Sequence, residues 1–272
     1  MKIHPMAVVS PQAKIGQNVE IGPFAVIESD VVIGDNCYID AHVKIDHYTT
    51  IGSGTRVYYG ALIGMPPQDH RCDPNIVSYT EIGNNCVIRE YVTIHRSPFA
   101  AQKTVVGDHA LLMAFVHIAH DVQIGSHVTI ANMTAVSGHV VIGDYAVLSG
   151  YILIHQFCRI GSLAMLGARA IIVQDVPPYC LVSESGHIAG PNTIGLRRAG
   201  LEPERRAAIR NAVKNYFFYG YNSLTAIAEI AKNGMTPEVE RFVEFVKSTK
   251  RGIVSGAPDM IYRKEAAPGE DR

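Results

Sequence analysis

The chain has 272 residues, of which 47% are hydrophobic and 18% charged, and its 24 Lys and Arg residues nearly balance its 25 Asp and Glu residues. This composition excludes a disordered chain, and the formal net charge of −1 excludes a strongly basic nucleic-acid-binding domain. We find neither a charged leader followed by an apolar stretch nor ~18 consecutive apolar residues, so we expect a cytoplasmic protein without membrane insertion.

An aliphatic residue recurs at every sixth position, from Ile3 to Ile63, from Ile82 to Ile94 and from Val106 to Ile172, and glycine commonly follows it. Neither the period of a helix nor that of a single strand explains this spacing. Short strands joined by tight corners do explain it, because the aliphatic side chain points inward and the small residue after it lets the chain bend. Three units then complete one coil of about 18 residues, and coils stack about 4.8 Å apart.

This pattern resembles the hexapeptide repeat of left-handed parallel β-helices. The left-handed sense is what the resemblance implies, because the general rule for parallel crossovers predicts a right-handed connection. We therefore expect residues 1–190 to form an all-β solenoid, a left-handed parallel β-helix. Stacked coils leave sheet edges and apolar surface at their limits, so the ends need caps and the flat faces need partners.

Two segments interrupt the repeat. Near residues 64–81 the spacing between core positions grows by one residue, and the segment is rich in proline and polar side chains. Near residues 96–104 the register continues, but Ala100 fills the core position and the sequence HRSPFAAQKT is typical of a loop. Both segments are expected to leave the rod, and loops carried by a rigid scaffold are where function tends to lie.

The repeat stops after about Val173, and residues 191–254 are expected to form a C-terminal α-helical domain that caps the rod. Three amphipathic helices are predicted, in RRAAIRNAVKNYFFYGY after Pro203, in SLTAIAEIAKNG and in TPEVERFVEFVKSTKRG. Residues 255–272 have little to bury and are predicted to be a flexible tail.

Histidines gather along one predicted edge of the rod, because stacking by about 18 residues aligns the core positions of three successive coils. The histidines beside these positions are His117, His120, His139 and His155. Such a cluster is typical of a general base with polar helpers or of a metal site, and corner histidines also occur as plain turn residues. Asp121 follows His120 and could orient its imidazole, while Gly138 leaves a backbone N–H open to a ligand.

A metal site is the alternative chemistry for this cluster. The gamma-class carbonic anhydrases share the left-handed helix and hold zinc with three histidines between subunits, leaving a further position for water. The spacing of His117 and His120 suits such ligands, but the geometry of an α-helix does not apply at a coil corner. We therefore expect no metal.

Six stretches of the chain carry a more specific signal: VTIHRS (Val92–Ser97), HIAHDVQIG (His117–Gly125), SGHVVIGD (Ser137–Asp144), HQFCRIG (His155–Gly161), QDVPPY (Gln174–Tyr179) and PNTIGLRRAG (Pro191–Gly200). Together they resemble the acyl carrier protein–UDP-N-acetylglucosamine O-acyltransferases of lipid A biosynthesis. Hexapeptides alone are shared by many transferases, whereas the run HIAHD joined to PNTIGLRR is specific. The similarity covers nearly the whole chain.

This resemblance implies a cytoplasmic homotrimer that transfers a 3-hydroxyacyl chain from acyl carrier protein to the 3-hydroxyl of UDP-N-acetylglucosamine, the first step of lipid A and hence lipopolysaccharide biosynthesis. It implies no metal or dissociable cofactor, because phosphopantetheine arrives on the acyl carrier protein. By matching positions, His120 would be the general base, Asp121 its support, and Gly138 the donor to an oxyanion. Substrate binding is expected at Gln68, Asp69, Arg71, His117, His139, His155, Gln156, Asn192 and Arg198.

The chain departs from the family pattern at several positions. Arg71 stands where lysine is familiar, while Ile194 and Ala199 replace a possible acidic residue and a third basic residue near the nucleotide contacts. Ala168 falls where the family sets the acyl chain length, since glycine there admits a longer chain and a bulky residue shortens it. The added methyl group predicts an intermediate preference of about 10–12 carbons.

Ala168 lies in a different predicted column from His120. A ligand that touches both is easiest to place between neighbouring subunits, which favours a trimer with shared sites. The helical segment also carries a run of basic residues that forms either a solvated face or a docking surface for an acidic acyl carrier protein. These residues are Arg197, Arg198, Arg205, Arg206, Arg210 and Lys214.

Several alternatives remain open on the sequence alone. The N-acyltransferase that acts later in the same pathway carries an N-terminal uridine-binding domain, for which a repeat beginning at Ile3 leaves no room. A related N-acyltransferase acting on a 3-amino UDP-sugar would use the same base. A zinc carbonic anhydrase of the gamma class and a non-catalytic scaffold belong to other classes, and metal analysis would distinguish the first of these.

Overall fold

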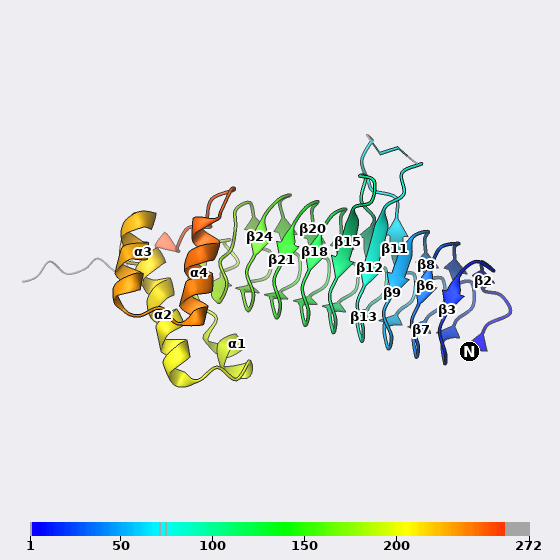
Figure 1. The fold of residues 1–272 in the computed structure, drawn as a ribbon, viewed down its shortest axis with the longest axis horizontal. Coiled ribbons are helices and arrows are strands. Elements are labelled where there is room, and N and C mark those ends of the chain that lie inside the picture. Colours follow the sequence, from blue (N-terminus) through cyan, green and yellow to red (C-terminus); the bar gives the residue numbers. More distant parts are fainter. Residues whose placement is uncertain (1, 71, 74, 259–272) are drawn as a thin grey trace, which may run out of the picture.

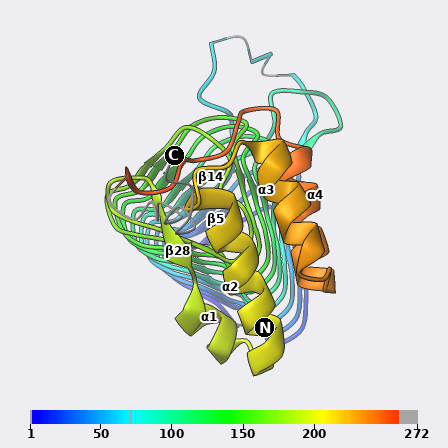
Figure 2. The same cartoon turned by 90° about the vertical axis from the view of Figure 1, so that its left-hand side faces the viewer.

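The six-residue repeat folds into a rod of three parallel β-sheets, the expected left-handed parallel β-helix (Figure 1). The structure is a computed structural model that describes residues 2–70, 72–73 and 75–258. Consecutive strands belong to different sheets, and each strand pairs in parallel with the strand three further along the chain. The cross-section of the rod is therefore a three-sided prism, seen end-on in Figure 2.

The strands are short and are grouped here as sheets A, B and C. Sheet A contains β1 (Lys2–Ile3), β4 (Glu20–Ile21), β7 (Tyr38–Ile39), β10 (Arg56–Val57), β13 (Val87–Ile88), β16 (Leu111–Leu112), β19 (Thr129–Ile130), β22 (Val147–Leu148), β25 (Met165–Leu166), β27 (Cys180–Val182) and β28 (Ile188–Pro191). Sheet B contains β2 (Val8–Val9), β5 (Val26–Ile27), β8 (Lys44–Ile45), β11 (Leu62–Met65), β14 (Thr93–His95), β17 (His117–Ile118), β20 (Ala135–Val136), β23 (Leu153–Ile154) and β26 (Ile171–Ile172). Sheet C contains β3 (Lys14–Ile15), β6 (Val32–Ile33), β9 (Thr49–Ile51), β12 (Tyr79–Ile82), β15 (Lys103–Val106), β18 (Gln123–Ile124), β21 (Val141–Ile142) and β24 (Arg159–Ile160).

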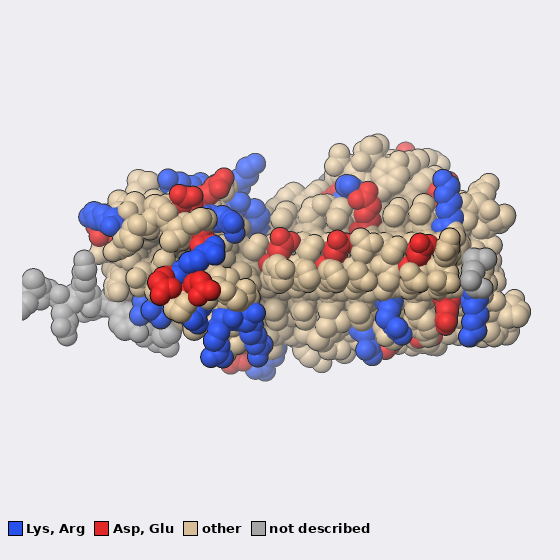
Figure 3. All heavy atoms as spheres, turned by 60° about the horizontal axis from the view of Figure 1, so that its bottom comes forward, with Lys and Arg blue, Asp and Glu red and all other residues tan. Residues whose placement is uncertain are grey.

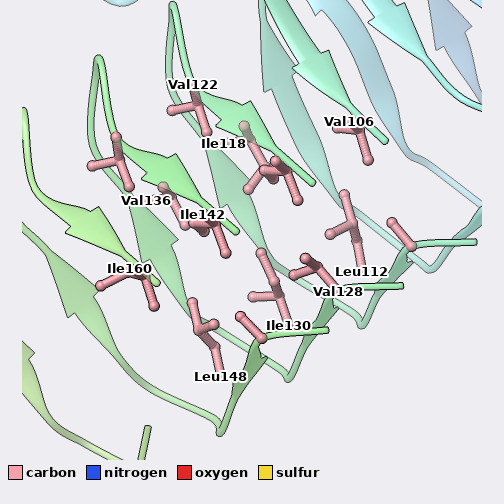
Figure 4. Packing of buried hydrophobic residues seen from close by; sticks show 14 of the residues in the cluster. Val106, Leu112, Ile118, Val122, Val128, Ile130, Val136, Ile142, Leu148 and Ile160 are labelled. Carbon is pink, nitrogen blue, oxygen red and sulfur yellow. The ribbon is translucent and has the colours of Figure 1, made fainter. Parts of the chain in front are cut away.

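The core consists of the repeated aliphatic side chains, which stack in columns along the axis (Figure 4). Leu112, Ile130 and Leu148 of sheet A are fully buried, as are Ile118 and Val136 of sheet B. Burying a side chain of this size contributes about 1.5–3 kcal/mol. Because every coil repeats this contribution, the core holds each corner in a fixed place relative to the corners of the neighbouring coils.

The corners require an unusual backbone conformation. The third residue after the core position takes a left-handed conformation, with φ of 58° at Asn36, 59° at Asp121 and 60° at His139. Such a conformation costs a residue other than glycine about 1–2 kcal/mol, and the packing of the coils offsets this cost. The preceding glycines permit close stacking, since a Cβ on Gly143 would lie only 2.6 Å from the backbone nitrogen of Ser162.

Two loops leave the rod at the corner after sheet B, and they protrude together beside β11 and β12 in Figure 1. The first spans residues 66–78, between β11 and β12, and the second spans residues 96–102, between β14 and β15. Both are narrower than the expected ranges 64–81 and 96–104, because β11, β12 and β15 extend beyond the two-residue length typical of this rod. The buried ion pair of Arg96 with Asp46, with a 3.0 Å N–O distance, lies at the base of the second loop.

Within the described residues, four helices close the C-terminal end of the rod (Figure 2). They are α1 (Thr193–Arg198), α2 (Pro203–Phe217), α3 (Ser223–Lys232) and α4 (Pro237–Lys247). The three helices expected after Pro203 correspond to α2, α3 and α4. The short α1 was not expected, and it begins where the Asn192 side chain accepts a hydrogen bond from the Gly195 N–H. None of the described helices has the length and apolar character needed to cross a membrane.

The chain returns to the rod after α4, which corrects the start of the expected tail. The N–H of Ile188 donates to the carbonyl of Ser255, and the Ile188 carbonyl accepts from the N–H of Ala257, each over 2.9 Å. Residue 255 was expected to begin a flexible tail, but the free edge of β28 supplies backbone partners there. Residues 259–272 lie outside the described residues.

We predict that Ile172→Ala lowers the free energy of unfolding by about 2–5 kcal/mol, because it removes core contacts and leaves a cavity. Its neighbour in β26, Ile171, is 63% exposed where Ile172 is fully buried, so Ile171→Ala is a matched control. The control is expected to change stability by less than about 0.5 kcal/mol. Urea unfolding followed by circular dichroism measures both variants, and equal losses would contradict this division into inward and outward faces.

Candidate active site

The corner after sheet B carries the polar cluster expected from the sequence. Strand β17 is followed by His120 and Asp121, and strand β20 is followed by Gly138 and His139. Because β17 and β20 pair in parallel and in register, their corners lie directly beside one another. The structure therefore brings these four predicted residues together.

A hydrogen bond between adjacent residues fixes the imidazole of His120. Its Nδ1 lies 2.8 Å from Oδ2 of Asp121. Since an ionised carboxylate only accepts hydrogen bonds, Nδ1 carries the hydrogen and Nε2 keeps a free lone pair. Asp121 can turn toward its neighbour because of its left-handed backbone, which is held by a 2.8 Å hydrogen bond from its N–H to Oγ1 of Thr104.

The surroundings of Asp121 favour its charged form. Burial alone would raise the pKa of the carboxyl, but the hydrogen bonds from His120 and Ser97 and the nearby His139 bring this pKa below its ordinary value. A carboxylate that stays ionised beside His120 stabilises a proton arriving on that ring. The pair has the arrangement expected of a general base and its orienting partner.

His139 forms a second wall of the cluster. Its ring stands perpendicular to that of His120 with 5.1 Å between centroids, and its Nε2 lies 3.8 Å from Oδ2 of Asp121. The ring stacks on Phe157 of the next coil, 4.5 Å between centroids. Burial lowers the pKa of His139 against the opposing effect of Asp121, so the ring favours its neutral form.

Gly138 packs against the ring of His120. A Cβ built on Gly138 would lie 2.7 Å from Cε1 and 2.8 Å from Nε2 of His120, so any side chain at this position would displace the ring. Within the described part of the chain, the Gly138 N–H has no protein acceptor. It is free to donate to a negatively charged oxygen that forms beside His120.

The cluster is reached from two sides. A hollow of about 180 Å³ is lined by Gln68, His95, His117, Ala119, His120, Ser137 and Gly138. A wider hollow of about 660 Å³ approaches from the side of sheet C and is lined by Phe99, Gln102, Lys103, Asp121, Gln123 and His139. Both protruding loops contribute residues to these walls, so they frame the pair of His120 and Asp121.

Two further histidines line the inner wall of the smaller hollow. Nδ1 of His117 lies 2.8 Å from Oγ1 of Thr93, and burial together with the neighbouring His95 lowers the pKa of His117 to about 4. His95 is 6% exposed, its ring centroid lies 5.1 Å from that of His117, and it was not among the predicted site residues. Its place in the repeat could have revealed it. His95 directly follows the core residue Ile94, and Ile94 pairs with Ile118 in the strand before His120.

Other predicted binding residues lie outside this hollow. His155 and Gln156 follow β23 on the next coil, where both are exposed. Asp69 belongs to the first protruding loop, where its carbonyl accepts a hydrogen bond from a backbone N–H. Arg71 falls outside the described residues. Their roles in binding remain predictions.

The remaining candidates lie away from the corner that carries His120. The side chain of Asn192 is buried and holds α1 to the rod, since its Nδ2 also donates to the carbonyl of Leu163 over 2.8 Å. Arg198 ends α1. Ala168 is exposed at the corner after β25, which connects sheets A and B rather than B and C. One chain alone therefore does not bring Ala168 and His120 to the same corner.

The cluster also offers atoms that could ligate a metal. One ligand atom from each of His120, Asp121 and His139 lies within 4.8 Å of the others. This donor set contains two imidazoles and one carboxylate, whereas a zinc site of the gamma-class anhydrases uses three histidines. The hydrogen bond between His120 and Asp121 suits a base, and independence from metal remains a prediction.

Both the rod and the helical end of the chain match known protein families. Residues 175–254 match the family described as Udp N-acetylglucosamine O-acyltransferase, domain 2. Residues 30–64 and 103–138 match the bacterial transferase hexapeptide family, described as six repeats. The first match covers the helical end of the molecule, and the second falls within the rod.

Individual relatives agree with these matches. The acyl-(acyl-carrier-protein)–UDP-N-acetylglucosamine O-acyltransferase of Chlamydia abortus is 40% identical over 98% of this chain and 97% of its own length. The protein of the same name from Halorhodospira halophila is 40% identical over 93% of this chain and 99% of its own length.

Solved structures show the same relationship. A UDP-N-acetylglucosamine acyltransferase from Bacteroides fragilis superposes with a TM-score of 0.90 at 40% identity, covering 92% of this chain and 99% of its own. The Francisella novicida UDP-N-acetylglucosamine acyltransferase superposes with a TM-score of 0.91 at 37% identity, covering 99% of this chain and all of its own. The chain is an acyltransferase and belongs to the acyl-(acyl-carrier-protein)–UDP-N-acetylglucosamine O-acyltransferase family.

Proposed function

We propose that this enzyme transfers a 3-hydroxyacyl chain from acyl carrier protein to the 3-hydroxyl of UDP-N-acetylglucosamine, the first step of lipid A biosynthesis, with His120 as the general base. The observation that carries this mechanism is the 2.8 Å hydrogen bond from His120 Nδ1 to Asp121, which leaves Nε2 free beside Gly138. Family membership supports the two substrates.

The reaction begins with proton transfer from the sugar hydroxyl to Nε2 of His120 as the sugar oxygen attacks the thioester carbonyl carbon. A new C–O bond forms, and the negative charge on the former carbonyl oxygen faces the Gly138 N–H. Asp121 stabilises the imidazolium. The C–S bond then breaks, and the phosphopantetheine thiol leaves with the proton returned by His120.

The substrates require more surface than the hollow of one chain supplies. Gln68, His117 and His139 lie beside the reacting groups, and His155 and Gln156 extend the site along the same corner. We assign Asp69, Arg71, Asn192 and Arg198 to contacts with the nucleotide sugar or the incoming chain. Arginine forks suit phosphate, and amide side chains suit hydroxyl groups and the uracil edge.

We propose a homotrimer in which neighbouring subunits complete each site. Ala168 lies at the corner between sheets A and B, and the same corner exposes the rings of Tyr91, Phe115 and Tyr151 at 45%, 50% and 59%. Exposed apolar side chains in a continuous row are typical of a protein interface. Contact between this corner and the corner after sheet B of a second copy would place Ala168 near His120.

The helical end is the proposed docking surface for the acidic acyl carrier protein. Lys and Arg side chains gather over this end of the molecule, with Asp and Glu side chains among them (Figure 3). Arg205 is less available to bind an acidic partner than the sequence indicated, because it forms an ion pair with the buried Glu238. Arg206 and Arg210 lie on the same helix, α2. We propose a cytoplasmic enzyme that needs no cofactor beyond the phosphopantetheine of its donor.

An N-acyltransferase acting on a 3-amino UDP-sugar is the second candidate, because the free lone pair of His120 serves an amine as well as a hydroxyl. Product formation from the amino sugar alone would favour this candidate. A zinc carbonic anhydrase is the third, and the ligand atoms of His120, Asp121 and His139 are the observation in its favour at this site.

We predict that His120→Ala lowers kcat about 10²- to 10⁴-fold, because the variant lacks the base. Mass spectrometry of acylated UDP-sugar, formed after treatment with a metal chelator, measures this loss. His127→Ala, which changes an exposed histidine at another corner, is the control and should retain full activity. Undiminished turnover by His120→Ala would refute the assigned base, and activity restored only by zinc would favour the anhydrase.

Gly138→Ala tests whether the close packing of Gly138 against the His120 ring is needed for catalysis. The added Cβ would push the His120 ring from its position, so we expect kcat to fall about 100-fold or more. The free energy of unfolding should change far less than in a core variant, because the corner is accessible from the hollow. Normal kcat in a folded Gly138→Ala enzyme would contradict the close packing of glycine against the base.

Ala168→Gly is expected to shift the preferred donor from about 10–12 carbons toward longer chains, because each further buried methylene contributes about 0.8 kcal/mol when space allows. Ala168→Leu should shift the preference toward shorter chains. Competition among 3-hydroxyacyl carrier proteins of different lengths, resolved by product mass, measures both shifts. If the unmodified enzyme turned over 14-carbon and shorter donors equally, Ala168 would not set the length.

A further inference from the structure

His95 has a polar atom that the proposed mechanism does not use. The residue follows β14 at the root of the second protruding loop, and its side chain is buried with 6% of the residue exposed. Nδ1 lies 2.7 Å from the carbonyl oxygen of Pro66 in the first protruding loop. Nε2 is buried and has no hydrogen-bond partner in the described structure.

The hydrogen bond to Pro66 decides which nitrogen of His95 carries the hydrogen. A carbonyl oxygen only accepts, so Nδ1 must donate to it, and Nε2 of the neutral ring is then an acceptor. Burial lowers the pKa of His95, with a further contribution from His120, so the ring is held in this neutral form. The unpaired atom is therefore an acceptor that lacks a donor.

The place of this acceptor connects it to substrate. His95 lines the same hollow as His120, Gly138 and Gln68, and its ring packs against that of His117. A buried acceptor without a partner costs free energy, and such costs are concentrated at functional sites. A substrate group that enters the hollow and donates a hydrogen bond would remove the cost.

We propose that His95 is a specificity-determining residue, whose Nε2 accepts a hydrogen bond from an O–H or N–H group next to the reacting atoms of a substrate. This inference rests on the proposed function and extends it. Two groups have this chemistry and position: the 3-hydroxyl of the acyl donor, near the thioester carbonyl, and the N–H at carbon 2 of the sugar, near the attacking hydroxyl.

Hydrogen bonds of His95 connect the two protruding loops. The ring of His95 is oriented by Pro66 of the first loop, while its backbone carbonyl accepts a 2.7 Å hydrogen bond from Oγ1 of Thr104 after the second loop. Thr104 Oγ1 in turn accepts from the N–H of Asp121. The acceptor in the hollow and the partner of the base are thereby held in one hydrogen-bonded arrangement.

The test compares substrates with and without the donating group. For the donor, acyl carrier protein carrying a 3-hydroxyacyl chain is compared with one carrying the unsubstituted chain. For the acceptor, UDP-N-acetylglucosamine is compared with UDP-2-deoxyglucose, which has no donor at carbon 2. We expect the unmodified enzyme to prefer the substrate with the group about 10- to 100-fold in kcat/KM, because its analogue leaves Nε2 unpaired.

Two substitutions of His95 separate the acceptor from the structural role of the ring. His95→Asn keeps an N–H that reaches Pro66 and removes the acceptor, so one of the two preferences should fall below about threefold. His95→Gln places an amide oxygen near the position of Nε2, and it should restore part of that preference. His109→Asn alters an exposed histidine outside the site and should leave both preferences unchanged.

Each outcome decides the proposal. Loss of the donor preference in His95→Asn identifies the acyl 3-hydroxyl as the group bound, and loss of the acceptor preference identifies the sugar N–H. Both preferences intact in folded His95→Asn and His95→Gln enzymes would overturn the proposal, as would an equal loss of kcat/KM on every substrate. No turnover by the unmodified enzyme with either acceptor would instead overturn the proposed function, and this inference with it.

Discussion

Packing of one aliphatic side chain per six residues into the axis of a three-sided rod is the interaction on which the rest of the structure depends. Side chains such as Ile118 and Val136 are fully buried in successive coils, and this burial fixes the corners that follow them. The corner residues then need no packing of their own to be held in place. Polar and strained residues are tolerated there because the neighbouring core positions supply the stability.

The hydrogen bond to Asp121 distinguishes His120 from the other histidines of the cluster. Burial lowers the pKa of His95, His117 and His139, so these rings stay neutral and do not repel a proton that arrives nearby. His120 alone among these histidines has Nδ1 in a close hydrogen bond to Asp121. A proton taken from substrate is therefore stabilised on one ring, and the neighbouring rings remain available as hydrogen-bonding groups.

The rod and the column of histidines could be predicted from the sequence because both follow from a constant period. An 18-residue spacing turns positions in the chain into neighbours in space, which places His120 and His139 together without a structure. His95 escaped this prediction because the loop at residues 96–102, which directly follows it, adds residues to the coil. Ala100, expected in the core, is exposed in that loop, and Ile94 pairs with Ile118 instead. The turn of Asp121 toward His120 also required the structure, since adjacent residues usually point apart and the left-handed backbone reverses that expectation.

The left-handed corner residue has a consequence for how such an enzyme can diverge. Asp121, His139 and Phe157 occupy the same corner slot of three successive coils, with φ between 59° and 66°. Their backbones are set by the stack whatever side chain they bear, so the chemistry of this corner can be exchanged residue by residue without refolding. Among the described residues of the loops at residues 66–78 and 96–102, only Ala101 has such a backbone. Substrate preference can therefore drift through the loops while the reacting groups stay in register with the coils.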